Sequence, residues 1–307
     1  MSGLFNTYYY GKAGKADYTV DQMPANRISL FFTVLRQNIG NLIKLNLIYD
    51  IFCLPMIVWI AINIMVFNSF EDQTSAVTSF ISGGYLSMFL LILIPCMMIM
   101  GIGSAGQMYI LRNWSKDQHA FLGSDFKDSI KTNWKTGLGL GAINGVSFYV
   151  LYIGYTYYGM MAQNSLFFIL PQTLMVVLFV VWWMMNQLTF SLLVSYEMKF
   201  RDLLRNAVIM SLAKLPFSIL FLLVTFGLSF AVLLIPYGQL VLPLYFVLIG
   251  FSVTGLIQAS FANSCFDKYM NPRIEGAKVG VGMRDPALDY LNPEEEEEIR
   301  KEAENLK

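Results

Sequence analysis

Charge is scarce in this chain, and long stretches have none. Only 14% of the 307 residues are charged and 56% are hydrophobic, whereas about a quarter of the residues of a typical soluble domain are charged. The net charge is zero, so the basic excess that nucleic-acid binding requires is missing. These scarcities argue against a soluble globular fold and against a nucleic-acid partner.

Residue types that often carry chemistry are also few. The chain has one histidine, His119, and three widely separated cysteines, Cys53, Cys96 and Cys265. An odd number of cysteines in or beside apolar stretches predicts free thiols rather than a disulfide framework. We find no phosphate-binding loop, zinc-protease motif or nucleophile elbow. We therefore expect no metal, no cofactor and no enzyme activity.

Four long runs of the sequence contain no charge. They cover residues 51–70, 73–111, 136–196 and 215–266. About 20 apolar residues cross a bilayer as a helix, so the first two runs hold one span each and the last two hold two. The sequence predicts an all-α, polytopic membrane helix bundle with six transmembrane helices, at residues 45–67, 84–111, 137–159, 166–195, 215–235 and 241–263.

The basic residues fall on one side of this topology. All 21 Lys and Arg residues lie before the first span, between spans two and three, between spans four and five, or after span six. The opposite loops carry only Glu71 and Asp72 as charges. The positive-inside bias thus predicts a multi-pass protein of the cell membrane with both termini in the cytoplasm, and the lipid bilayer as its surroundings. The polar, Tyr-rich first 25 residues predict no cleavable signal peptide.

Composition divides the chain into three parts. We expect a polar N-terminal segment over residues 1–27, a six-span membrane domain over 28–270 and a cytoplasmic acidic tail over 271–307. In the tail we expect a linker over 271–291 and then a short solvated helix, because Asn292-Pro293 and a run of glutamates form a good helix start. An acidic docking segment for a partner is the other interpretation of the tail.

A short amphipathic stretch precedes a span in each of three cytoplasmic segments. The stretches are residues 31–38, 126–133 and 200–206, and each begins with Phe and carries an aliphatic residue four positions later. Residues at this spacing share one helix face, and such a helix can lie in the membrane interface. We expect amphipathic cytoplasmic surface helices here. A threefold internal repeat and the general character of inner loops both explain the pattern.

Two groups of glycines lie at close spacing in predicted spans. The groups are Gly101, Gly103 and Gly106, and Gly137, Gly141 and Gly145. The first group has the letters of a dinucleotide-binding loop but lies in an apolar run with no strand before it, so close helix packing explains it better. The second group recurs at every fourth residue, which lets two helices approach closely. Its partner is a helix of the same chain or a second copy.

Several polar stretches make the chain recognisable. Asn46-Leu47-Ile48-Tyr49, with Cys53-Leu54-Pro55 after it, resembles the opening of the YesL-like family of bacterial integral membrane proteins. Residues 100–135 carry the most specific part of the resemblance, which extends roughly over residues 28–220 and includes Leu204-Arg205-Asn206-Ala207 with Leu215-Pro216. One departure is the roughly 40 residues between Pro55 and Pro95, which add a full crossing. The resemblance implies an association with carbohydrate ABC-import systems and no known functional residues.

The inner loop after the second span is the best candidate for a docking surface. It mixes bases, acids and aromatic residues, as protein contacts do. A general-base pair of His119 and Asp125 is the weaker interpretation, because their spacing gives no reason for contact. The candidate partner-docking residues are Arg112, Trp114, His119, Asp125, Phe126, Asn133 and Trp134. The resemblance suggests ABC importer permease or ATPase subunits as partners.

A second set of candidates is the polar residues within the spans. They are Asp50, Asn144, Asn186, Gln187 and Glu197. Ionisable groups in a bilayer face the bundle interior or a water-filled cavity, so Asp50 and Glu197 either pair with nearby bases such as Lys44, Lys199 or Arg201 or serve a substrate or a proton. The amides are typical interhelical contacts.

Two functions are compatible with these residues. The first is an accessory or regulatory membrane protein associated with a carbohydrate ABC importer, favoured by the surface helices and the lack of catalytic groups. The second is a small-solute transporter or permease-like subunit, because Leu204-Arg205-Asn206-Ala207 with Leu215-Pro216 is weakly similar to the coupling loop of ABC permeases. The hallmark Glu-Ala-Ala and Gly residues of that loop are missing, and the oligomeric state is not predictable.

Overall fold

The computed structural model describes residues 23–69, 74 and 84–284, apart from the side chain of Gln239. Within this part the chain is helical and has no strand. The main elements are α2 (Arg27–Asn68), α4 (Tyr85–Trp114), α5 (Ser124–Ala162), α6 (Ile169–Ser195), α7 (Phe200–Ala213), α8 (Leu215–Leu233), α9 (Gly238–Tyr245), η3 (Phe246–Gly250) and α10 (Phe251–Tyr269). Short 3-10 turns, η2 (Leu166–Phe168) and η4 (Asn271–Arg273), precede α6 and follow α10.

Six helical segments of the described chain are long and apolar enough to cross a membrane. They begin at Arg27, Tyr85, Ser124, Leu166, Leu215 and Leu240. The prediction of an all-α bundle with six such helices is therefore confirmed. The loop acids Glu71 and Asp72, residues 1–22 and the predicted helix of the acidic tail lie outside the described residues.

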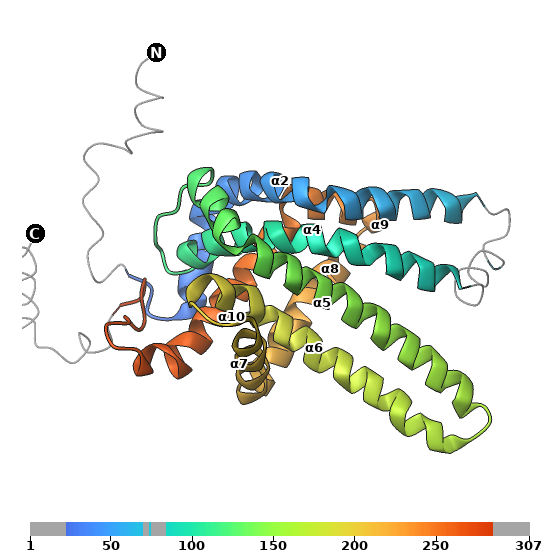
Figure 1. The fold of residues 1–307 in the computed structure, drawn as a ribbon. Helices are drawn as coiled ribbons and strands as arrows, with labels where there is room; N and C mark the ends of the chain where they lie inside the picture. Colours follow the sequence, from blue (N-terminus) through green and yellow to red (C-terminus); the bar gives the residue numbers. More distant parts are fainter. Residues whose placement is uncertain (1–22, 70–73, 75–83, 285–307) are drawn as a thin grey trace, which may run out of the picture.

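The helices are arranged as hairpins. Figure 1 shows α2 running beside α4, and α5 beside α6, with the two pairs diverging away from the loop that joins α4 to α5. That loop, the start of α2 and the end of α10 gather at one end of the molecule (Figure 1, left). We call this the basic end, because it carries Arg27, Lys116 and Lys268. The same end holds both clusters of buried apolar side chains, around Leu111 and around Phe266.

Only one of the three expected surface helices is a separate helix. Residues 31–38 are the beginning of α2, and residues 126–133 are the beginning of α5; both helices continue without interruption into their spans. No proline lies between these stretches and the spans to stop the helix. Their apolar residues, such as Val34 and Phe126, are buried in the bundle core rather than turned toward lipid. The third stretch forms the beginning of α7, which ends at Ala213, and Lys214 separates it from Leu215-Pro216 at the start of α8.

Gly101 of the first group of glycines faces Gly137 and Gly141 of the second group. A Cβ atom on Gly101 would lie 2.3 Å from the carbonyl oxygen of Gly137, and one on Gly141 would lie 2.2 Å from the carbonyl oxygen of Met97. One on Gly145 would lie 2.8 Å from the Cα atom of Ile94. Helices α4 and α5 therefore touch backbone to backbone, a contact that only glycine permits. The prediction of close helix packing within one chain is confirmed.

Gly141→Ala should destabilise the bundle by about 1–3 kcal/mol, because the added methyl group must push two backbones apart. Thermal unfolding in detergent measures the change. Gly227→Ala in α8 is the matched control, since its Cβ would meet no atom within 4 Å. The control should be neutral or slightly more stable, as alanine favours helix by about 1 kcal/mol over glycine. Equal melting of both variants would contradict the backbone contact.

Cysteine labelling tests the orientation of the bundle. Asn164, between η2 and α5, and Gln118, at the basic end, are both exposed, whereas the three native cysteines are buried. A membrane-impermeant thiol reagent should label Asn164→Cys in intact cells and Gln118→Cys only after permeabilisation. The reverse pattern would place the basic end outside the cell.

Candidate functional site

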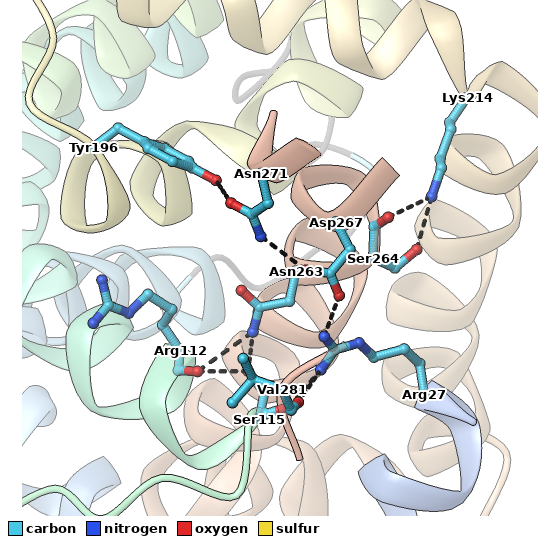
Figure 2. A network of polar contacts seen from close by, with 10 residues as sticks. All are labelled: Arg27, Arg112, Ser115, Tyr196, Lys214, Asn263, Ser264, Asp267, Asn271 and Val281. Carbon is cyan, nitrogen blue, oxygen red and sulfur yellow. Dashed lines mark hydrogen bonds and ion pairs between the residues drawn. The ribbon is translucent and has the colours of Figure 1, made fainter. Parts of the chain in front are cut away.

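A polar network holds the helices together at the basic end. Arg27, in the first turn of α2, forms an ion pair with Asp267 of α10 (Figure 2). Its guanidinium group also donates hydrogen bonds to the carbonyl oxygens of Val281, at 3.2 Å, and Ser115, at 3.4 Å. One side chain thereby joins the start of α2 to the end of α4, to α10 and to the segment after α10.

The network runs along one face of α10 and into η4. Asn263, Asp267 and Asn271 follow each other at intervals of four residues, so they share a helix face. The amide of Asn263 donates to Ser115 Oγ at 2.6 Å, and that of Asn271 donates to Asp267 Oδ1 at 2.8 Å. The hydroxyl of Tyr196 donates to Asn271 Oδ1 at 2.6 Å (Figure 2). These residues are not among the candidates predicted from the sequence, although their spacing of four residues is a signal that a sequence shows.

Burial shifts the pKa values of several groups around this network. Burial raises the pKa of Tyr196 to about 12, and the nearby charge of Asp267 adds to the shift. Burial also lowers the pKa of Lys116 and of Lys214. The ammonium group of Lys214 donates to the carbonyl oxygen of Ser264, at 2.9 Å, and to its hydroxyl, at 2.8 Å, which ties the junction of α7 and α8 to α10. Tyr196 and Lys214 thus find their hydrogen-bond partners within the protein, as structural groups do.

We expected residues 271–291 to form a linker. The described part of this segment, which follows α10, instead contacts the basic end. The amide of Arg284 donates to the carbonyl oxygen of Pro24 at 3.0 Å. Met283 packs against the apolar cluster around Leu111, and Gly282 lies against the backbone of Lys116. Residues 271–284 therefore lie against the basic end, because the backbone of Arg284 forms a hydrogen bond there and the side chain of Met283 packs there. The rest of the predicted linker lies outside the described residues.

A groove opens beside this network, between the start of α5 and residues 193–198. Its volume is about 710 Å³. Among the described residues, its lining includes Asp125, Asp128 and Glu197 and no Lys or Arg. We call it the acidic groove. Within the described chain, no three His, Cys, Asp or Glu side chains converge closely enough to hold a metal ion, so the three carboxylates form a dispersed negative lining.

Hydrogen bonds fix both walls of the acidic groove. Arg112 donates to the carbonyl oxygen of Val194 at 2.6 Å, which holds the wall formed by residues 193–198 against α4. On the other wall, Asp125 accepts a hydrogen bond from the backbone amide of Phe121 at 2.9 Å. The hydroxyl of Ser129 donates to the carbonyl oxygen of Ala105 at 2.9 Å, which fixes α5 against α4. The groove is therefore pre-formed.

The seven candidate docking residues fall into three groups. Asp125 and Asn133 line the acidic groove, and Arg112 supports its wall from within. His119 and Trp134 are exposed, His119 with its ring against Phe121. Trp114 and Phe126 are buried in the core and are not available to a partner. The reason is that α4 and α5 pack together through the segment that the sequence suggested was a solvent-facing loop.

The candidate polar residues of the spans are also dispersed. Glu197 is exposed, lines the acidic groove and forms no ion pair within the described chain. Gln187 is buried and donates to the carbonyl oxygen of Ser218 at 3.3 Å. Asn186 donates to the carbonyl oxygen of Trp182 at 2.9 Å, and Asn144 is half-buried on α5. Asp50 is buried beside Asn46, whose amide donates to its carboxyl group.

A smaller pocket lies between four helices. Its volume is about 180 Å³, and α2, α4, α6 and α10 all contribute to its lining. The lining combines hydroxyl and amide groups with aromatic rings and contains no charged side chain: Tyr49, Met100, Ser104, Gln107, Met108, Asn186, Phe190, Phe251, Thr254, Gly255 and Gln258. Among the candidates from the sequence, only Asn186 reaches this pocket.

Arg27→Met should destabilise the protein by about 3 kcal/mol, because Asp267 would be left buried without its cation. It should also speed proteolysis of residues 271–284, which lose the bond to Val281. Thermal unfolding in detergent and limited proteolysis measure the two effects. Lys278→Met is the control, since Lys278 is exposed on the same segment. If both variants behave alike, the ion pair does not hold the basic end together.

The chain is similar to one known family over part of its length. Residues 84–155 match a family described as a protein of unknown function, DUF624. The match covers α4, the loop at the basic end and most of α5, and it therefore includes the glycine contact and one wall of the acidic groove. No curated protein and no solved structure matches the chain.

Proposed function

We propose that this protein is an accessory membrane protein that docks a basic cytoplasmic segment of a partner in the acidic groove. The observation that carries the proposal is the groove itself. Its volume is about 710 Å³, and the charged residues that line it within the described chain are Asp125, Asp128 and Glu197. Complementary charge across an interface gives specificity and speeds association.

The surroundings of the groove make its charge distinctive. The basic end carries most of the cations of the described chain, among them Lys127, Lys131 and Lys199. A negative groove within a positive surface attracts a cationic segment locally, while the surrounding cations favour the anionic lipid surface. Because its walls are held by hydrogen bonds and by the contact of α4 with α5, the groove loses little conformational freedom on binding.

We further propose that the partner is a permease or ATPase subunit of a carbohydrate ABC importer. This step is supported by the resemblance of residues 28–220 to the YesL-like family. The proposed setting is the bacterial cell membrane, with the groove in the cytoplasm. In this role the protein needs no catalytic group and no cofactor. The water-exposed surface of the groove is sufficient for binding the partner.

A second candidate function is the transport of a small solute. The pocket between α2, α4, α6 and α10 favours this function. Burying a polar side chain in a membrane bundle costs free energy unless the side chain has a partner, and a solute could be that partner. Tyr49, Gln107 and Gln258 place such groups around one space of about 180 Å³. This volume suits a small uncharged solute or several waters. Flux of a solute into liposomes that contain the purified protein alone would favour this function.

Glu197→Lys should disrupt docking without disturbing the fold, because Glu197 is exposed and forms no ion pair within the described chain. Complexes purified from cells in gentle detergent and identified by mass spectrometry should contain permease or ATPase subunits with the wild type. The variant should recover about tenfold less of them, which is the effect of losing roughly 1.4 kcal/mol of binding free energy.

Glu275→Lys provides the matched control, because it reverses an exposed acid at the same end of the molecule but outside the groove. It should recover the partner as the wild type does. Equal losses for both variants would show that overall charge, not the groove, matters. Recovery that is unchanged by Glu197→Lys would exclude the groove as the docking site.

A further inference from the structure

The sixth span is helical from Leu240 to Arg273 but changes to π geometry at η3, in its first half, and we call this change the break. The chain enters α9 through Tyr237, which has a left-handed backbone with φ of 63°, and α9 contains Pro243. The five residues of η3 then form a π-helical turn before α10 begins. π-turns are rare and concentrate at functional sites. Within a membrane, irregular backbone persists only where other groups satisfy its polar atoms.

Asn46 of α2 is the group that satisfies this break. Its side-chain amide donates to the carbonyl oxygens of Phe246, at 2.8 Å, and Val247, at 2.9 Å. Its own oxygen accepts a hydrogen bond from the backbone amide of Ser252 at 2.9 Å. The same side-chain amide also faces Asp50 Oδ2, at 3.2 Å. Its two hydrogens are therefore shared among three acceptors, and the carboxyl group of Asp50 has the longest of the three contacts.

Asp50 is left with little that stabilises a negative charge. Its exposed fraction is 8%, and its Oδ1 atom is buried without a hydrogen-bond partner. The titratable groups beside it are Tyr49 and Cys53 of α2, neither of which is a cation. The contacts of the neighbouring Asn46 with η3 and α10 are with backbone carbonyls and with the backbone amide of Ser252, and the described ion pairs do not include Asp50.

This arrangement suits a neutral carboxyl group. A lone carboxylate in an apolar medium is strongly disfavoured unless a cation or several N–H donors face it. An alkali metal ion would need several oxygen ligands, whereas a proton needs only one oxygen. We propose that Asp50 is a proton-binding site at the break in the sixth span and that it carries its proton at neutral pH.

Loss of this proton would act on the break through Asn46. Release of H⁺ to solvent turns the carboxyl group into a carboxylate, which accepts hydrogen bonds more strongly than a neutral carbonyl oxygen. The side-chain amide of Asn46 then turns toward Asp50, and the carbonyl oxygens of Phe246 and Val247 lose their donor. Proton binding at α2 is thereby coupled to the conformation of η3 and α10. The site is independent of the acidic groove.

Infrared spectroscopy of the full-length protein in detergent tests the proposal. At pH 7 the wild type should show the C=O stretch of a protonated carboxyl group. Asp50→Asn should lose this band and keep the thermal stability of the wild type, because the amide has the shape of the neutral acid. Asp128→Asn is the matched control, since Asp128 is exposed and paired with Lys131. It should leave the band unchanged.

Two outcomes would overturn the proposal. One is a spectrum at pH 7 from which Asp50→Asn removes nothing. The other is loss of the band when sodium chloride replaces choline chloride, because a metal ion would then be the ligand. Asp50→Glu covers the case in which Asp50→Asn does not fold. It retains the carboxyl group, so the band should shift in frequency and persist.

Discussion

The backbone contact between α4 and α5 is the constraint on which the rest of the structure depends. The backbones of α4 and α5 approach each other at Gly101 and Gly137 and at Met97 and Gly141. They are so close there that no Cβ atom would fit on these glycines. This contact fixes the beginning of α5 against α4 and so places Asp125 and Asp128 opposite residues 193–198. It also lets the aromatic ring of Phe126 enter the core, next to Gly106. The acidic groove exists because two helices can approach this closely.

A second set of contacts closes the basic end around this pair. The ion pair of Arg27 with Asp267 joins α2 to α10. Asn271 bonds to both Asp267 and Tyr196, which connects this pair to the end of α6. Their mutual satisfaction explains why buried polar groups are tolerated here. The α2–α4 and α5–α6 hairpins diverge away from the basic end (Figure 1). Apolar side chains near the far end of the second hairpin, such as Met160 and Leu170, are exposed. The part of the bundle that borders the groove is thus also the part that holds its buried apolar clusters.

The sequence predicted the fold well and the site only in part. Charge-free runs and glycine spacing are local signals, so the six spans and the close packing of Gly141 could be predicted. Burial depends on which helices meet, so Trp114 and Phe126 were wrongly expected on the surface. The network of Asn263, Asp267 and Asn271 was missed because its partners lie on other helices. The role of Asn46 was hidden because its acceptors are backbone carbonyls, which a sequence does not show.

The central claim is that the acidic groove holds a basic segment of a partner. Photo-crosslinking in living cells tests this claim most directly. A photoreactive residue at Thr132 would lie in the groove, and one at exposed Lys127 would lie on the same helix outside it. We predict that only the probe at Thr132 forms a product with a permease or ATPase subunit, joined through a Lys- or Arg-rich cytoplasmic peptide. Products with lipid alone, or the same protein product from both positions, would contradict the account.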